Sequence, residues 1–165
     1  MCFERGSMKY KKVVFTKVSA EVSKANRRFF ERNVRKAFVK YLAYSHMFDD
    51  VLTDIEIEQA KEGFLPKDLD VHHIFPISGT ADEKVNSFKN LTVLHKATHI
   101  MINRQIFEPQ LKDVSSMQEG EKREIVIPVF KQVDAGRIVA LRSGQMKRSK
   151  SAIKRPPLRG RDLGR

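Results

Sequence analysis

The clearest pattern along the chain is a helical one over residues 22–44. Apolar side chains recur there at steps of three and four, which predicts an amphipathic helix of about six turns. These apolar positions are Val22, Ala25, Phe29, Phe30, Val34, Ala37, Phe38, Tyr41 and Leu42. The other face carries seven basic residues: Lys24, Arg27, Arg28, Arg32, Arg35, Lys36 and Lys40. Because only Glu31 offsets them, this face is interpreted either as a solvated charged surface or as one that contacts phosphates.

Local signals predict two further elements in the first 65 residues. Thr53 followed by Glu56 fits a capping box at the start of a helix over residues 54–62. Gly63 is a suitable residue just past the end of that helix. Ahead of the long helix, residues 9–18 predict a short strand or an N-terminal arm.

The centre of the chain predicts two short strands followed by a helix. Residues 70–75 are expected to form the first strand, which Pro76 ends, and residues 91–94 the second. The polar segment 77–90 between them is turn-like. A helix is expected over residues 95–107, with Pro109 just past its end.

The last third of the chain predicts two strands and a tail. After a polar stretch over 108–123, residues 124–130 and 137–141 are expected to be strands around a turn at 134–136. Pro128 inside the first of them indicates an edge position or a bulge. No apolar periodicity remains from Arg142 on, so residues 142–165 are expected to be a disordered basic tail.

Composition restricts the class of protein. With 165 residues, of which 41% are hydrophobic, the chain is long enough for one domain with an extension and is not wholly disordered. It has no apolar run near the roughly 20 residues that span a bilayer, so no membrane partner is expected. The opening residues carry Glu4 and no apolar segment, so a secretory signal is not expected either. The single Cys2 excludes a disulfide framework within the chain and favours a cytoplasmic location.

The charge is unevenly distributed. Residues 1–48 hold 12 Lys or Arg and 3 acids, a net +9, and residues 142–165 hold 9 and 1, a net +8. Residues 49–141 hold 11 and 16, a net −5. Basic ends attract polyanions, and nucleic acid is the commonest such partner.

Four of the five histidines fall within residues 72–99. Imidazole titrates near neutrality and binds divalent metal ions, so such a cluster suggests metal or acid–base chemistry. His95, His99 and Asn103 are spaced to lie on one face of the predicted helix, while His72 and His73 lie on the first strand. A strand pair packed on that helix would bring the two groups together.

The segment from Asp70 to Gly79, with Asn90-Leu91, His99 and Asn103, resembles the HNH nuclease motif of the ββα-metal superfamily. The resemblance covers about a quarter of the chain, near residues 68–106, and the intervals 73–90, 90–99 and 99–103 fit it. It implies an α+β fold with a ββα-metal centre over residues 66–107. Residues 1–65 would then be a basic helical region, residues 108–141 a short β segment packed on the core, and residues 142–165 the tail.

The resemblance also implies roles for individual residues. His73 would be the general base, and Asn90 would pin the loop between the strands and help to orient that base. His72, His99 and Asn103 would hold one divalent metal ion. Asn103 stands where many members have a histidine, so the site favours Mg²⁺, Mn²⁺ or Ni²⁺ more than a three-histidine site would, with Zn²⁺ kept as a candidate.

Alternatives stand beside several of these assignments. His73 could instead be a buried core histidine. His72 could point away from the site, because adjacent strand residues face opposite sides. Asp70 is interpreted as a strand-edge group or one that supports a ligand, in preference to a ligand itself. His95 is interpreted as a group that packs under the helix, supports a ligand or contacts phosphate, with a ligand role as the further alternative. The cysteine pairs of many relatives are absent, so the core is expected to rest on packing by Ile74, Phe75, Leu91, Val93, Leu94, Ile100 and Ile102.

The resulting expectation is a metal-dependent endonuclease that hydrolyses phosphodiester bonds in DNA, with double-stranded DNA as its first candidate substrate. A phage or mobile-element origin would fit the small size and the basic flanks. The residues expected to contact nucleic acid are Arg28, Arg32, Arg35, Lys147, Arg148, Lys150, Lys154 and Arg155. Two alternatives stay open: a catalytically degenerate nucleic-acid-binding protein, favoured by Asn103 and the basic ends, and an RNA-directed nuclease.

Overall fold

The computed structural model describes residues 8–79 and 83–144, which form a mixed α+β fold with two antiparallel two-stranded sheets. The strands are β1 (Tyr10–Thr16), β2 (Leu69–His73), β3 (Leu91–His95) and β4 (Lys122–Pro128). The helices are α1 (Ala20–Phe29), α2 (Arg35–Tyr44), α3 (Asp54–Lys61), α4 (Lys96–Ile102), α5 (Glu108–Val114) and α6 (Ala135–Arg142). The expected tail contacts Lys147, Arg148, Lys150, Lys154 and Arg155 lie outside the described residues.

The helix predicted over residues 22–44 is confirmed as one long element, the α1–α2 helix. A π-turn at Phe30–Val34 joins its two halves, and the Ser19 side chain caps its start by accepting a hydrogen bond from the Val22 N–H. The π-turn widens the helix locally and shifts its apolar stripe. Four of the predicted apolar positions are exposed instead of buried: Phe29 by 55%, Tyr41 by 43%, and also Ala25 and Ala37.

The capping box that predicts α3 is confirmed. Thr53 Oγ1 accepts from the Glu56 N–H, and the Glu56 carboxylate accepts from the Thr53 N–H. Gly63 follows the helix with φ of +92°, a backbone conformation that favours glycine.

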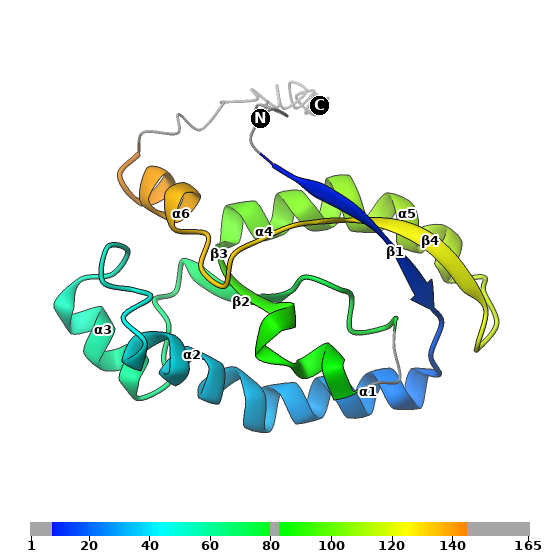
Figure 1. Ribbon diagram of the computed structural model, residues 1–165, viewed down its shortest axis with the longest axis horizontal. Helices are drawn as coiled ribbons and strands as arrows, with labels where there is room; N and C mark the ends of the chain where they lie inside the picture. Colours follow the sequence, from blue (N-terminus) through cyan, green and yellow to red (C-terminus); the bar gives the residue numbers. More distant parts are fainter. Residues whose placement is uncertain (1–7, 80–82, 145–165) are drawn as a thin grey trace, which may run out of the picture.

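The β2–β3 hairpin lies at the centre of the molecule, between two long helices (Figure 1). Its antiparallel register pairs Leu69 with His95 and His73 with Leu91, close to the predicted strands. One face packs with the α1–α2 helix through a core that includes Val71, Leu91 and Val93. Leu94 belongs to a second core, on the side of α4. The hairpin is thus covered on both faces.

The helix that begins at Lys96 runs further than the sequence predicts. A π-turn at Asn103–Phe107 joins α4 to α5, so the helix passes through Pro109 and ends at Val114. The expectation that it ends before Pro109 is wrong. Proline is tolerated in the first turn of a helical segment, and the register shift of the π-turn gives Pro109 such a position in α5.

The second sheet pairs the two ends of the described chain. The predicted strand near 124–130 is confirmed as β4, and its antiparallel partner is β1, with Tyr10 opposite Pro128 and Thr16 opposite Lys122. The prediction of a strand over 137–141 is wrong, because this segment belongs to the helix α6. Ile138 is fully buried while Val139 is 41% exposed, and the Asp134 carboxylate ahead of the helix binds Arg137. The region 108–141 therefore holds α5, β4 and α6 rather than a β segment alone.

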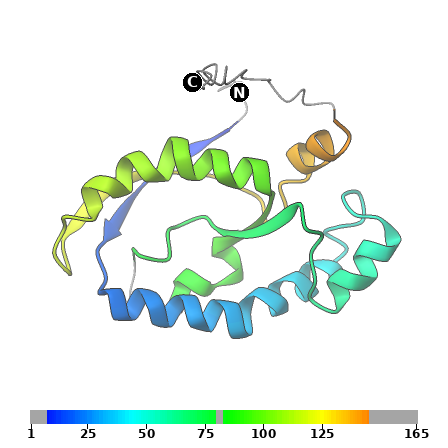
Figure 2. The same ribbon diagram turned by 180° about the vertical axis from the view of Figure 1, so that it is seen from behind.

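The β1–β4 sheet lies against the α4–α5 helix (Figure 2). The contact buries Phe15, Ile125 and Ile127 with Ile102, Phe107 and other apolar side chains of the second core. Most of the predicted core residues of the central region are buried: Ile74, Leu91, Val93, Leu94 and Ile102, with Phe75 partly so. Ile100 is the exception. It is 52% exposed, because it lies on the outer face of α4.

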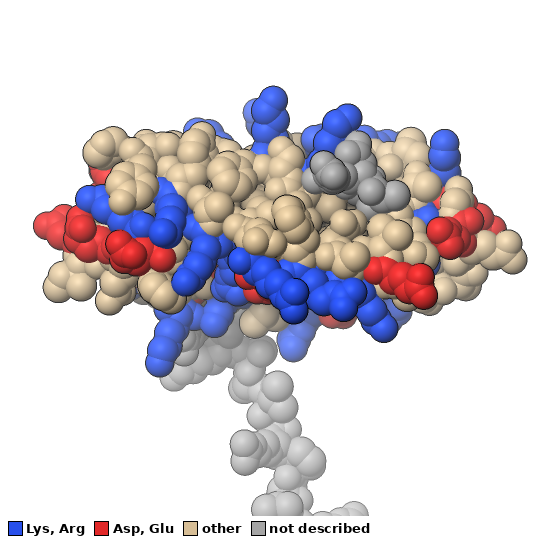
Figure 3. All heavy atoms as spheres, turned by 90° about the horizontal axis from the view of Figure 1, so that it is seen from below, with Lys and Arg blue, Asp and Glu red and all other residues tan. Residues whose placement is uncertain are grey.

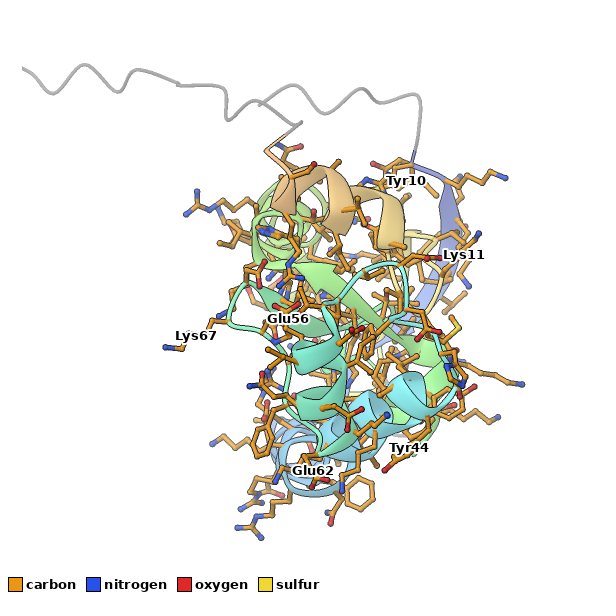
Figure 4. All side chains as sticks on the ribbon, turned by 90° about the vertical axis from the view of Figure 1, so that its left-hand side faces the viewer. Tyr10, Lys11, Tyr44, Glu56, Glu62 and Lys67 are labelled. Atoms are coloured by element: carbon orange, nitrogen blue, oxygen red, sulfur yellow. The ribbon has the colours of Figure 1, made fainter. Side chains whose placement is uncertain are left out.

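Arg142 at the end of α6 anchors that helix to the body of the protein. Its guanidinium donates to the Asp68 carboxylate at 2.8 Å and to the Glu56 carboxylate at 3.0 Å. In Figure 4 the labelled Glu56 lies at the start of α3, with α6 above it. The expectation that Arg142 begins a disordered tail is therefore wrong. None of the helices in the described ranges is long and apolar enough to cross a membrane.

Replacing Arg142 by leucine should lower the free energy of unfolding by about 2 kcal/mol, since two half-buried carboxylates lose charged hydrogen bonds. The hydrogen bond from Arg142 lowers the pKa of Glu56 to about 2 from 4.5. Stability from this contact is complete above pH 4.5 and is lost as the pH falls towards 2. Thermal unfolding across that window should therefore depend less on pH in Arg142→Leu than in the wild type.

The matched control is Arg123→Leu, which removes an exposed arginine whose contact with Asp113 spans 4.0 Å. It should change stability by no more than about 0.5 kcal/mol. Equal melting curves for the two variants would show that Arg142 does not anchor α6.

Candidate functional site

A cavity of about 390 Å³ lies beside β2, between the two long helices. It brings together five of the residues singled out in the sequence: Asp70, His72, His73, His99 and Asn103. Both π-turns border it, through Phe30 and Glu31 on one side and Asn103 and Phe107 on the other. Such turns are rare and frequently occur at functional sites.

The pleat of β2 directs its two adjacent histidines to opposite sides. The His72 ring faces the α4–α5 helix, with its centre 4.8 Å from that of His99 and 5.7 Å from that of Phe107. The His73 ring faces the α1–α2 helix and meets Phe30 edge-on at 4.5 Å. Because both rings still line the cavity, the two helices and the strand each contribute to one site.

His72 is nearly enclosed, with 6% of its surface exposed. Its Nε2 is buried and has no hydrogen-bond partner among the described residues. Burial, aided by the neighbouring His99 and His73, lowers the pKa of His72 to about 3, so the ring is neutral at physiological pH. A neutral imidazole nitrogen with no hydrogen-bond partner can act as a metal ligand.

A carboxylate supports His99 from behind. Asp70 Oδ2 lies 3.1 Å from His99 Nδ1, and Asp70 Oδ1 accepts from the Arg35 guanidinium at 3.2 Å. Burial acts to raise the pKa of Asp70, but His99 and Arg35 outweigh it and hold that pKa below its usual value. A carboxylate can only accept, so the Nδ1 of His99 carries a hydrogen, and in the neutral ring Nε2 keeps the lone pair. Asp70 therefore has the supporting position that the sequence favoured over a ligand position.

His73 has a partner that the sequence did not reveal. Its Nε2 lies 3.0 Å from the Asn86 Oδ1, an atom of the polar segment between the two strands. Burial lowers the pKa of His73, while the hydrogen bond with Asn86 acts in the opposite direction. Nothing in the segment 77–90 distinguished Asn86 from its polar neighbours, because the contact depends on how the loop folds back.

Asn90 holds the two ends of that loop together. Its Oδ1 accepts from the Phe75 N–H at 2.7 Å, and its Nδ2 donates to the Phe75 carbonyl at 3.1 Å and the Val85 carbonyl at 2.8 Å. This is the loop-pinning arrangement expected from the sequence. The side-chain hydrogen bonds of Asn90 go to Phe75 and Val85, whereas the side chain bonded to His73 is that of Asn86.

His95 lies apart from the cavity. It is the N-cap of α4, where its Nδ1 accepts from the Ala97 N–H at 3.1 Å, and its Nε2 lies 3.8 Å from Asp68. Both contacts belong to the start of the helix. His95 is therefore a capping residue in this fold, and the cavity takes only His99 and Asn103 from the predicted helical face.

The basic residues expected to contact nucleic acid occupy different environments. Arg28 and Arg32 are exposed on the α1–α2 helix, whereas Arg35 is partly buried against Asp70. Arg27 lies on the side of the helix that borders the cavity. Figure 3 shows Lys and Arg side chains gathered in a band along the face on which this helix lies. The band thus runs beside the cavity.

The donor set of the cavity fits a metal ion only if an amide oxygen takes part. No three His, Cys, Asp or Glu side chains within residues 8–79 and 83–144 are grouped so that they could hold one. The candidate donors are the Nε2 of His72, which is fully buried and has no partner among the described residues, the Nε2 of His99 and the amide of Asn103. Two imidazoles and one amide oxygen can still bind a divalent cation.

Comparison with known proteins identified no relative of this chain. No protein-family model, no curated protein and no solved structure matches the chain. The candidate site is therefore defined by the contacts of this chain alone: a histidine pair on one side of β2 and a third histidine, held by Asn86, on the other.

Proposed function

We propose that this protein is a metal-dependent endonuclease of the HNH type, which hydrolyses phosphodiester bonds in DNA. In this proposal β2, β3 and α4 are the ββα-metal centre. The observation that carries it is the cavity in which His73 lies across the strand from His72 and His99. It combines a candidate base and candidate metal ligands within one small space.

His73 is the general base of the proposed reaction. Phosphodiester hydrolysis needs a group that takes a proton from the attacking water, and neutral imidazole can do so at physiological pH. Burial favours the neutral form of His73 by lowering its pKa. Its contacts with Phe30 and Asn86 fix the ring within the cavity.

His72, His99 and Asn103 are the residues that would hold the metal ion. Once bound, a divalent cation supplies positive charge for the phosphoryl group and the leaving 3′ oxygen. The amide of Asn103 favours a hard cation, Mg²⁺ or Mn²⁺, with Ni²⁺ or Zn²⁺ as further candidates. Asp70 and Arg35 orient His99 from behind, which is typical of histidines that bind metals.

The α1–α2 helix supports DNA as the substrate. Exposed Arg28 and Arg32 offer charge to phosphates beside the cavity, and Arg27 lies at its border. Contacts by Lys147, Arg148, Lys150, Lys154 and Arg155 belong to this proposal as well. Double-stranded DNA is the first substrate to test, with 5′-phosphate and 3′-hydroxyl ends as the expected products.

One observation favours a second candidate function, a nucleic-acid-binding protein without catalysis. The described residues offer no three His, Cys, Asp or Glu side chains as a metal site, so metal binding depends on Asn103. Such a protein would bind DNA through its basic face but cleave none. A cleavage assay with metal ions separates the two candidates.

Replacing His73 by alanine should reduce the rate of DNA cleavage by about 10²–10⁴-fold, because the base is lost. Folding and DNA affinity should change little. The rate is measured with Mg²⁺ or Mn²⁺ on double-stranded DNA, single-stranded DNA and RNA in parallel. The matched control is His46→Asn, since His46 has an 80% exposed side chain and a positive φ that asparagine tolerates.

More than a tenth of the wild-type rate in His73→Ala would exclude His73 as the base. Absence of cleavage by the wild type with every substrate and metal ion would favour the binding protein. Cleavage confined to RNA would identify an RNA-directed nuclease.

Replacing His99 by alanine should weaken metal binding and cleavage together, by at least the roughly 10–100-fold in affinity that loss of a group supporting a ligand costs. Excess metal should restore part of the activity, because the base is still present. Calorimetry with Mn²⁺ measures the affinity. The control is His95→Asn, which keeps a capping side chain at the start of α4. If His95→Asn lost Mn²⁺ and His99→Ala kept it, the assignment of the helical ligand would be wrong.

A further inference from the structure

The side chain of Asn86 connects the proposed base to the α1–α2 helix. Its Oδ1 lies 3.0 Å from His73 Nε2, and its Nδ2 donates to the Asn26 carbonyl at 3.0 Å. Asn86 is only 8% exposed. A single buried amide therefore touches both β2 and α1, two elements that are distant in sequence.

The polarity of these two hydrogen bonds is fixed. The Asn26 carbonyl can only accept, so the NH₂ group of Asn86 must face it. The amide oxygen is then the atom that faces His73, and it too can only accept. His73 must consequently donate, which places its hydrogen on Nε2 and leaves the lone pair on Nδ1.

The other ring nitrogen of His73 is available for chemistry. Nδ1 has no hydrogen-bond partner among the described residues, and it is not one of their fully buried unpartnered atoms. It therefore remains accessible to a water molecule. The unpaired nitrogen, rather than the paired one, is the atom that can accept a proton.

We propose that Asn86 is a positioning residue that holds His73 as the Nε2–H tautomer, with the Nδ1 lone pair available to the attacking water. The inference rests on the proposed nuclease function. It adds a residue that acts through His73, and it assigns the proton-accepting atom. Removing Asn86 leaves both tautomers of His73 accessible, so part of the population has a hydrogen on the atom that must accept one.

The same amide ties the base to the helix that bears the basic face. Asn26 directly precedes Arg27 and Arg28 in α1. The backbone that positions these arginines therefore also supports Asn86. The helix that would contact the DNA phosphates is consequently also the helix that holds Asn86, so the base has a fixed position relative to the bound DNA strand.

The tautomer is measured by ¹H–¹⁵N correlation of the His73 ring at about pH 8, where histidine is largely neutral. The His73 signals are identified by their loss in His73→Gln. The wild type should show the hydrogen on Nε2, and Asn86→Ala should show a mixture of both forms. Asn86→Asp loses the hydrogen bond to the Asn26 carbonyl but keeps an acceptor for Nε2, so it should keep the wild-type tautomer.

Kinetics provide the second readout. In Asn86→Ala, kcat for DNA cleavage should fall by about 10–100-fold. KM should change by less than about twofold, since Asn86 touches α1 only through the Asn26 carbonyl and the arginines keep their places on an intact helix. The matched control is Asn33→Ala, which removes an exposed amide of the α1–α2 helix. It should change neither the tautomer nor kcat.

A wild-type protein with the hydrogen on Nδ1, or an unchanged tautomer in Asn86→Ala, would overturn the inference. Equal behaviour of Asn86→Ala and Asn86→Asp in the tautomer measurement would also overturn it. Circular dichroism establishes that both variants fold. The Nε2–H tautomer in a wild type that cleaves no nucleic acid would support the role of Asn86 and contradict the nuclease function.

Discussion

The site depends on one geometric constraint, the alternation of side chains along β2. Successive residues of a strand face opposite sides, so His72 and His73 pack against different helices although both line the cavity. Both sides of the hairpin are covered by a long helix, and each histidine is therefore matched to a different set of neighbours. A slip of one residue in the strand register would exchange the two sets. The pairing of Val71 with Val93 inside the first core stabilises the correct register.

Local sequence signals were sufficient where the structure depends on nearby residues. Three signals involve residues that are close together in the sequence. They are the apolar spacing over 22–44, the capping box at Thr53 and the histidine pair at positions 72 and 73. The site residues on β2 and α4 were also predictable, because a strand pair followed by a helix brings those segments together. The structure brings His72, His73, His99 and Asn103 to one cavity, whereas His95, predicted on the same helical face, caps α4 instead.

The remaining features depend on contacts between distant segments. Strand β4 has its partner in β1, more than 100 residues earlier, so the sequence around β4 suggested a hairpin with residues 137–141 instead. Asn86 reaches His73 only because Asn90 folds the intervening loop back. Arg142 begins a basic segment without apolar periodicity, which is typical of a tail, yet its side chain binds Glu56 and Asp68. Each of these contacts depends on tertiary packing rather than on local preference.

The most direct test of this account is the position of a bound metal ion. Crystals containing Mn²⁺ give an anomalous difference peak at the ion. We expect that peak beside the Nε2 atoms of His72 and His99 and the amide of Asn103, with His73 across the strand and free of metal. A peak at His73, a peak remote from the cavity, or no peak at saturating Mn²⁺ would contradict the division of β2 into a metal-binding side and a base side.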